Sequence, residues 1–345
     1  MIVSHAPAQD GGTAERRRAA FLSLAVGGVV LAGKIAAYGV TGSTAVLSDA
    51  MESVVNVAAA IFLVFSIRLA AQPADRNHPY GHGKIEFLAA GVEGTLILLA
   101  AGLILAEAIG DILRGPELHR IGLGLALLAG LTVLNAAMGL YLIRVGKRLN
   151  SLALRADGAH LMTDVVTTVG VLVGLLAVRL TGWAYFDPIA AIAVAANILR
   201  TGWLLGREAV RGLMDEVDEA LLEQITTQLQ EKRRPWWIDV HTLRVWHSGS
   251  EQHADFHLTV PRYYDTDRLH DIDDELRWGV FGRDESPGDI VVHFDPCRPR
   301  HCRRCAVEAC PVRGKEPDEP LPFSVADCTR ADEILDTGLP VRNPG

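Results

Sequence analysis

The first 206 residues alternate between long apolar stretches and short polar breaks, a pattern typical of membrane-spanning helices. The apolar stretches lie near residues 19–40, 43–70, 85–112, 121–143, 152–179 and 184–206. Several are longer than the roughly 20 residues that a helix needs to cross a hydrocarbon core about 30 Å thick. The pattern therefore predicts a membrane bundle of six transmembrane helices. The second, third and fifth stretches carry carboxylates, so these helices cannot face lipid on all sides.

After residue 206 the pattern changes to shorter elements, typical of an α+β domain. Apolar residues at helical spacing predict helices over residues 218–233 and 265–278. Runs rich in β-branched and aromatic residues predict strands over residues 238–246, 253–260 and 289–294. The order helix, strand, strand, helix, strand favours a two-layer fold of one sheet and its helices.

These changes of pattern define the expected domains. We expect an N-terminal tail over residues 1–18, the membrane domain over 19–206, the α+β domain over 207–296 and an extension over 297–345. The extension is rich in Cys, Pro and charged residues. From Arg313 onward its composition predicts a loosely ordered chain.

The net charge per segment also changes after residue 206. The formal net charge is −8, of which residues 1–206 contribute +2 and residues 207–345 contribute −10. With 49% hydrophobic residues, the composition excludes a disordered chain and a basic nucleic-acid-binding protein. Lys and Arg gather at alternate ends of the apolar stretches, which predicts that both termini are cytoplasmic in a protein of the inner (plasma) membrane. The polar start and the long run after it are not typical of a cleavable signal peptide.

Two polar pairs interrupt the apolar stretches at helical spacing. Glu52 and Asn56 lie four residues apart in the second stretch, and His160 and Asp164 lie four apart in the fifth. Each pair therefore occupies one helical face, and two such faces can bring four donors around a divalent ion. Either pair alone is equally consistent with an interhelical hydrogen-bond cluster. The two pairs together favour a metal site.

A second candidate metal site lies in the polar break between the second and third stretches. Asp75, His78 and His82 fall within eight residues and offer one carboxylate and two imidazoles. The neighbouring Pro79, Gly81 and Gly83 are equally typical of a solvated turn, and composition alone favours that interpretation.

The predicted α+β domain carries a third group of candidate ligands, and the extension carries a fourth. The third group contains four histidines and an aspartate, namely His241, His257, His270, His293 and Asp295. The fourth is the cysteine run of Cys297, Cys302, Cys305 and Cys310. In a strand, His293 and Asp295 point to one face, and this many ligands in a small domain favour metal binding. The spacing of the cysteines fits neither a paired zinc knuckle nor a ferredoxin run, so zinc, an iron–sulfur cluster and plain reduced thiols all stay open.

With these motifs in place, the sequence resembles the cation diffusion facilitator family. The resemblance rests on the run from Ser48 to Asn56, the run from Asp157 to Asp164 and the loop from Asp75 to Lys84. It also rests on the spacing of the four domain histidines. The loop and this spacing are similar to those of the bacterial zinc and iron exporters.

The resemblance implies six transmembrane helices, a cytoplasmic metallochaperone-like domain and a two-fold homodimer in the lipid bilayer. It implies export of a divalent metal, zinc, iron(II), cobalt or manganese, in exchange for protons. It also implies a binuclear metal site in the cytoplasmic domain, where zinc is the expected ion. Lys84 and Asp215 match the positions of a charge interlock at the dimer seam.

The sequence departs from the family pattern at the centre of the membrane. Family members usually carry His or Asp followed four residues later by Asp, whereas this chain has Glu52 and Asn56. A set of Glu, Asn, His and Asp is rich in oxygen, which favours iron(II), manganese or cobalt over zinc. Asp49 lies one turn before Glu52 and could replace a missing ligand.

Two rival functions are consistent with parts of the sequence. A membrane-anchored metal sensor would explain the α+β domain, but it gives no reason for ionisable pairs inside apolar helices. A redox protein could use the cysteine run to hold a cluster. The chain contains no phosphate-binding Walker motif, so we do not expect ATP-driven pumping. We expect a transporter and not an enzyme.

Overall fold

The computed structural model describes residues 10–41, 44–115, 124–183, 185–280, 288–316 and 322–331. The chain forms two compact units. One contains the residues up to Met214 together with the turn at 248–250, and the other contains residues 215–247 and the chain from Glu251 onward.

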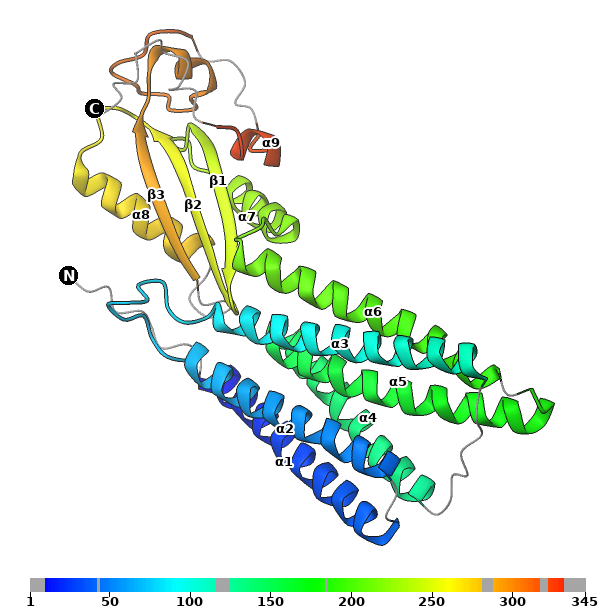
Figure 1. Ribbon diagram of the computed structural model, residues 1–345. Coiled ribbons are helices and arrows are strands. Elements are labelled where there is room, and N and C mark those ends of the chain that lie inside the picture. The colour runs from blue at the N-terminus through cyan, green and yellow to red at the C-terminus, as the bar shows by residue number, and fades with distance from the viewer. Residues whose placement is uncertain are drawn as a thin grey trace, which may run out of the picture. The chain divides into compact units, whose positions relative to one another are not determined.

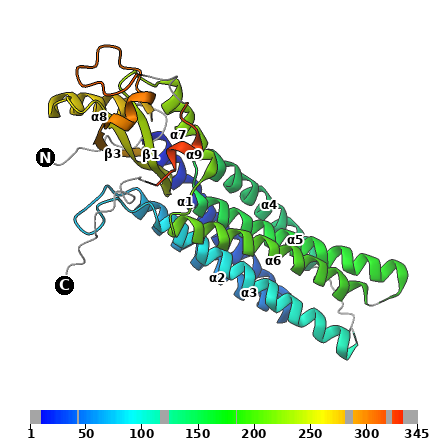
Figure 2. The ribbon, with the colours of Figure 1, turned by 90° about the horizontal axis from the view of Figure 1, so that it is seen from above.

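The first unit is a bundle of long helices that run side by side (Figure 1; Figure 2). Its described residues form α1 (Asp10–Thr41), α2 (Thr44–Ala70), α3 (Ile85–Arg114), α4 (Gly124–Arg148), α5 (Leu152–Thr181) and α6 (Phe186–Leu213). These six helices correspond to the six predicted apolar stretches. Within the described chain, four segments are long and apolar enough to cross a membrane: Gly12–Ala36, Ser53–Ala70, Ile85–Arg114 and Pro188–Leu213.

Small residues let neighbouring helices of the bundle approach closely. At the crossing of α4 and α5, a Cβ added to Gly158 would lie 2.8 Å from the Gly139 carbonyl oxygen. At the crossing of α3 and α6, a Cβ added to Gly94 would lie 3.1 Å from the Gly206 nitrogen. Backbone contact through small residues is a common way for membrane helices to associate, because lipid supplies no hydrophobic force between them.

A buried carboxylate, Glu86, ties three helices together at the start of α3. Arg16 of α1 lies 3.2 Å from Glu86 Oε1, and Ser151 donates its hydroxyl hydrogen to Glu86 Oε2. The Ser151 oxygen also accepts a hydrogen bond from the backbone N–H of Leu154, so it caps the N-terminus of α5. Because its charge is paired, Glu86 has a structural role at this position.

The second unit is a small sheet covered by helices, in the predicted order helix, strand, strand, helix, strand. Its elements are α7 (Glu219–Glu231), β1 (Asp239–Ser248), β2 (Glu251–Val260), α8 (Thr266–Val280) and β3 (Gly288–Pro296). The described strands lie in the order β1-β2-β3, and β2 and β3 are parallel because α8 connects them (Figure 1). The core consists of apolar side chains from α7, α8 and one face of the sheet, including Ile225, Phe256 and Ile272.

The opposite face of the sheet carries several of the candidate metal ligands. Along β2, Ala254, Phe256 and Leu258 are buried in the core, so the alternating His257 points to the other face. His257 is paired with His293 of β3 in the parallel register. In β1, Thr242 has a φ of 56°, which lets Val240 and Leu243 both reach the core while His241 faces away from it.

The extension belongs to the second unit and packs against its sheet and helices over part of its length. It forms a short 3₁₀-helix, η1 (Pro299–Arg304), and the short helix α9 (Val325–Cys328). Phe323 and Cys328 lie in the domain core, and the Arg233 guanidinium lies 4.0 Å from the centre of the Phe323 ring. The loosely ordered chain expected after Arg313 is therefore packed over residues 322–331.

Candidate metal sites

Three of the four predicted membrane ligands, Asn56, His160 and Asp164, meet inside the helix bundle. The Asn56 side-chain amide of α2 donates a hydrogen bond to Asp164 Oδ2 of α5 at 2.8 Å. Its amide oxygen lies 2.8 Å from His160 Nε2, so it is the acceptor for a proton on that nitrogen. Glu52 and Asp49 also lie in α2, but their side chains are outside the described part of the structure.

Two further carboxylates, Glu93 and Asp157, lie near these residues, although the sequence did not single them out as ligands. We call Asn56, His160, Asp164 and Glu93 the membrane cluster. Glu93 of α3 places Oε2 at 3.4 Å from His160 Nδ1, and both side chains are more than 90% buried. Among the described residues, Glu93 Oε2 has no hydrogen-bond donor. Asp157 of α5 is buried one turn before His160 and accepts a hydrogen bond from Ser23 of α1 at 2.5 Å. The carboxylate in the third apolar stretch was the sequence signal that could have identified Glu93. The pattern did not show whether this carboxylate points into the bundle.

The loop between α2 and α3 brings its three predicted ligands together. One ligand atom each from Asp75, His78 and His82 lies within 4.8 Å of the other two. Asp75 is held by the chain itself, because it accepts hydrogen bonds from the backbone N–H groups of Asn77 and His78 at 2.8 Å and 2.7 Å. The hydrogen bond from His78 is the main reason why the pKa of the Asp75 carboxyl is below its usual value. An ionised Asp75 beside two imidazoles can bind a metal ion.

The polar face of the sheet holds a second such cluster, formed by His241, His257 and Asp295. Asp295 Oδ2 lies 2.9 Å from His257 Nδ1 and 3.5 Å from His241 Nε2. His293 is at the edge of the cluster, with its ring 4.5 Å from that of His257 and with 66% of its side chain exposed. His270 lies apart from them on α8, exposed and 4.0 Å from Asp274.

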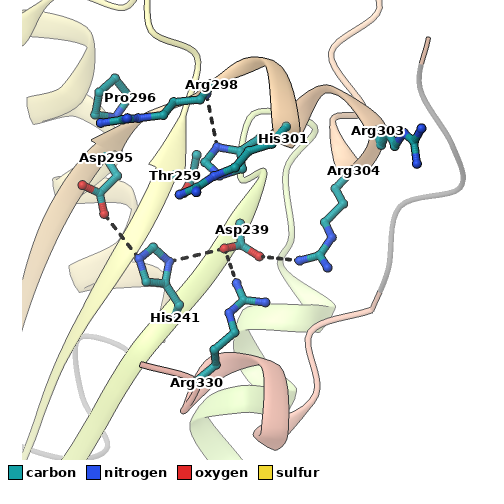
Figure 3. Close-up of a pocket in the computed structure, with 11 residues that line it drawn as sticks. Asp239, His241, Thr259, Asp295, Pro296, Arg298, His301, Arg303, Arg304 and Arg330 are labelled. Atoms are coloured by element: carbon teal, nitrogen blue, oxygen red, sulfur yellow. Dashed lines mark hydrogen bonds and ion pairs between the residues drawn. The ribbon is translucent and has the colours of Figure 1, made fainter. Parts of the chain in front are cut away.

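Asp239 contacts His241 at the ring nitrogen that does not face Asp295, as Figure 3 shows. Its Oδ2 atom lies 3.3 Å from His241 Nδ1 and 2.6 Å from a guanidinium nitrogen of Arg330, and Arg304 lies 3.5 Å from Oδ1. Burial alone would raise the pKa of Asp239, but the hydrogen bond to His241 and the charge of Arg330 hold it below its usual value. The sequence did not single out Asp239, because its partners Arg304 and Arg330 belong to the extension.

A cavity of about 300 Å³ opens beside the Asp239 carboxylate. It is lined by acidic and imidazole groups from the sheet and by arginines from η1 and from the segment after α9. The extension therefore contributes directly to the surroundings of His241.

The four cysteines of the run lie around one small cavity of about 30 Å³. Burial raises the pKa of the Cys297 thiol, and the nearby Cys305, Cys310 and Cys302 thiols raise it further. The fifth cysteine, Cys328, lies in the domain core.

The two residues predicted to form a charge interlock lie in different units, with Lys84 directly before α3 and Asp215 after α6. Their role at a dimer seam stays a prediction.

Comparisons with known proteins match both units of the chain. Residues 20–214 match the family model of the cation efflux transmembrane domain, and residues 217–297 match that of the cation efflux protein, cytoplasmic domain. A protein of Synechocystis sp. called an uncharacterized transporter is 39% identical over 278 residues, which cover 80% of this chain and 89% of that protein. The cation-efflux pumps FieF of Salmonella paratyphi A and Salmonella agona are 29% identical over 295 residues, 83% of this chain and 95% of theirs.

Proposed function

Because the chain belongs to the cation diffusion facilitator family, an integral-membrane family of cation efflux transporters, we propose that it exports a divalent metal from the cytoplasm in exchange for protons. The observation that carries this proposal is the partly buried cluster of Asn56, His160, Asp164 and Glu93 among apolar helices. Ionisable groups inside a membrane are costly and by default mark an ion or proton pathway.

The composition of the cluster favours an ion site over a purely structural hydrogen-bond network. Neutral amides and hydroxyls would be enough to connect helices, whereas this cluster contains two carboxylates and an imidazole around one amide. The buried Glu93 oxygen lacks a hydrogen-bond donor among the described groups, which is costly unless a cation or proton reaches it. A divalent ion would satisfy this oxygen and offset the negative charge.

Proton exchange follows from the same ligands. A metal ion binds neutral imidazole and deprotonated carboxylates, so binding expels protons, and proton binding releases the ion. An imidazole such as that of His160 can bind either a proton or a metal ion at the same ring nitrogen, so the two partners compete. Alternating access of the bundle would then expose the ligands first to the cytoplasm and afterwards to the far side.

The membrane site is rich in oxygen, so we propose iron(II), manganese or cobalt as favoured substrates, with zinc also transported. Asn56, Asp164 and Glu93 offer oxygen atoms, and His160 offers the nitrogen. Oxygen ligands suit harder divalent ions than sulfur and multiple imidazoles do.

The second unit is proposed to be a cytoplasmic metal sensor rather than part of the transport path. His241, His257 and Asp295 would hold a zinc ion, since imidazole nitrogen and carboxylate oxygen are common zinc ligands. We further propose a homodimer with both termini in the cytoplasm of an inner (plasma) membrane protein, in which Lys84 and Asp215 pair at the seam. His270, apart from the cluster of its own chain, would then be available to the second copy.

The test is metal flux into sealed vesicles that contain the purified full chain, with zinc, iron(II), manganese and cobalt under an imposed pH gradient. We expect flux that depends on the gradient and is abolished by His160→Ala and by Asp164→Ala. His247→Ala is the matched control, because this histidine pairs with Asp218 outside the proposed sites. Normal flux in both membrane variants would refute the transport site. Metal binding by the wild type without any flux would support the membrane-anchored sensor instead.

A further inference from the structure

The cysteine run forms its own structural feature, distinct from the His and Asp clusters. Cys297 directly follows β3, Cys302 lies in η1, and Cys305 and Cys310 follow it in irregular chain. All four side chains line the cavity of about 30 Å³. All five cysteines of the chain are described, and none forms a disulfide.

Backbone groups are already directed at two of these sulfur atoms. The N–H of Arg262 donates to Cys297 Sγ at 3.4 Å, and the N–H of Gly314 donates to Cys302 Sγ at 3.4 Å. The backbone turns back between Cys302 and Cys305, where the Cys305 N–H donates to the Cys302 carbonyl at 3.3 Å. Hydrogen bonds of this kind stabilise a sulfur that carries negative charge, as a metal-bound thiolate does.

We propose that Cys297, Cys302, Cys305 and Cys310 bind one structural zinc ion. Four thiolates are a common ligand set for structural zinc. The cavity is small, about 30 Å³, which suits a single ion better than a bulkier iron–sulfur cluster. The sulfur atoms are more widely spaced than the ligands of the two His and Asp clusters, so binding would draw them inward.

The surroundings of the cavity suit the charge of such a site. A zinc ion with four thiolates carries a net charge of −2, and three arginines, Arg262, Arg298 and Arg313, also line the cavity. The segment from Cys297 to Glu316 contains one short helix and little apolar core, so it has few other means of holding a defined fold. A zinc ion would fix this segment, and with it Arg304 near Asp239.

The test uses the purified full chain with cobalt(II) in place of zinc, because cobalt bound to thiolates gives an intense charge-transfer absorption that cobalt bound to His and Asp does not. We expect this absorption in the wild type and in His257→Ala, and its loss in the double variant Cys302→Ser with Cys305→Ser. Cys328→Ala is the matched control and should keep it, since this cysteine does not line the cavity. No absorption in the wild type, or full absorption in the double variant, would overturn the proposal.

A measurement on the wild-type chain tests the proposal even if the variants do not fold. Zinc should protect the four cysteines of the run from alkylation, and removal of zinc with a chelator should expose them, as counted by mass spectrometry of the peptides. Zinc content should be lower by one ion per chain in the double variant. Equal alkylation with and without zinc, or a brown protein that contains iron and acid-labile sulfide, would overturn the zinc site.

Discussion

At the scale of single residues, Asn56 uses both ends of its side-chain amide. The nitrogen donates to Asp164 and the oxygen faces His160 Nε2, both at 2.8 Å. The amide therefore keeps a carboxylate and an imidazole in register when no ion lies between them. An aspartate at this position would face Asp164 with a like charge, so it would need a proton or a metal ion to remain there.

We predict that Asn56→Asp binds divalent ions more tightly and changes the preference among zinc, iron(II), manganese and cobalt. Unit charges about 4 Å apart attract by about 4 kcal/mol at an effective dielectric constant of about 20, before the cost of burying another carboxylate. Protons also compete for the added carboxylate, so the transport optimum should move to higher pH. Vesicle flux measured against pH for each metal tests this.

Asn135→Asp is the matched control, because Asn135 is buried in α4 and has no place in the membrane cluster. It should leave metal preference unchanged. If Asn56→Asp changes neither metal preference nor pH profile, Asn56 does not touch the ion, and Asp49 becomes the better candidate for the fourth ligand.

Glu93 is the residue of the membrane cluster with the clearest separate test. We predict that Glu93→Gln, which keeps shape and removes charge, lowers flux about 10- to 100-fold. This corresponds to losing a charge-assisted interaction of about 1.5–3 kcal/mol. Glu107→Gln on the same helix is the control, since Glu107 is exposed. Flux in Glu93→Gln equal to that of the control would remove Glu93 from the transport site.

Glu93 also marks the limit of sequence-based prediction at this scale. The i,i+4 pairs could be predicted because helical spacing fixes which residues share a face. The direction of a single carboxylate in an apolar stretch depends on the rotation of its helix in the bundle. Packing of α3 against α5 and α6 sets that rotation, and no local pattern encodes it.

At the scale of elements, the six helices and the order of the sheet domain were predictable for a simple reason. Long apolar runs with polar ends are typical of membrane-spanning helices, and short runs rich in β-branched and aromatic residues are typical of strands. The packed part of the extension was not predictable. Phe323 and Cys328 are single apolar residues among Pro and charged residues, and they become core only because α7 provides the surface that they cover.

The contact between the extension and β1 gives a prediction about metal affinity. Arg330 holds Asp239, and Asp239 faces His241 Nδ1, so that Nε2 is directed toward Asp295. Partners behind a metal ligand usually contribute 10- to 100-fold to affinity. We predict that Arg330→Ala weakens zinc binding at His241, His257 and Asp295 about tenfold, measured by competition with a chelating dye.

The matched control is Arg244→Ala. It removes an exposed arginine of β1, the strand that carries Asp239 and His241, and this arginine lies 3.5 Å from Asp255. It should leave zinc affinity unchanged. Equal affinities in the two variants would show that the extension does not orient His241.

Cys328 gives a second prediction at this scale. Burial raises the pKa of its thiol from about 9 to about 12, so the folded chain keeps it protonated. The fold is therefore stabilised below pH 9, and this contribution is lost as the pH rises toward 12. We predict that Cys328 resists alkylation in the folded chain at pH 8 and at pH 10, and reacts after denaturation. Rapid reaction at pH 10 without unfolding would contradict its burial.

At the scale of the whole molecule, three His and Asp groups and one thiol group are distributed over two units. The membrane cluster and the loop cluster of Asp75, His78 and His82 belong to the first unit, and the remaining two belong to the second. Only the membrane cluster lies among apolar helices, where an ion must lose its water to enter. This difference in surroundings suggests that one group moves the ion and the others respond to it.

The different roles proposed for the two units predict different phenotypes for two histidine variants of the full chain. His257→Ala removes a ligand that lies 2.9 Å from Asp295, so it should abolish zinc binding at the sheet cluster. Flux at saturating metal should stay within about twofold of the wild type, because the membrane ligands are intact. Zinc bound at the sheet cluster can favour one arrangement of the proposed dimer over another. Because the variant lacks this zinc, its flux at limiting metal should fall. Vesicle flux across a range of metal concentrations separates the two effects, with His247→Ala as the control from the same domain. If His257→Ala loses flux as completely as Asp164→Ala at saturating metal, the second unit is part of the transport path and is not a sensor.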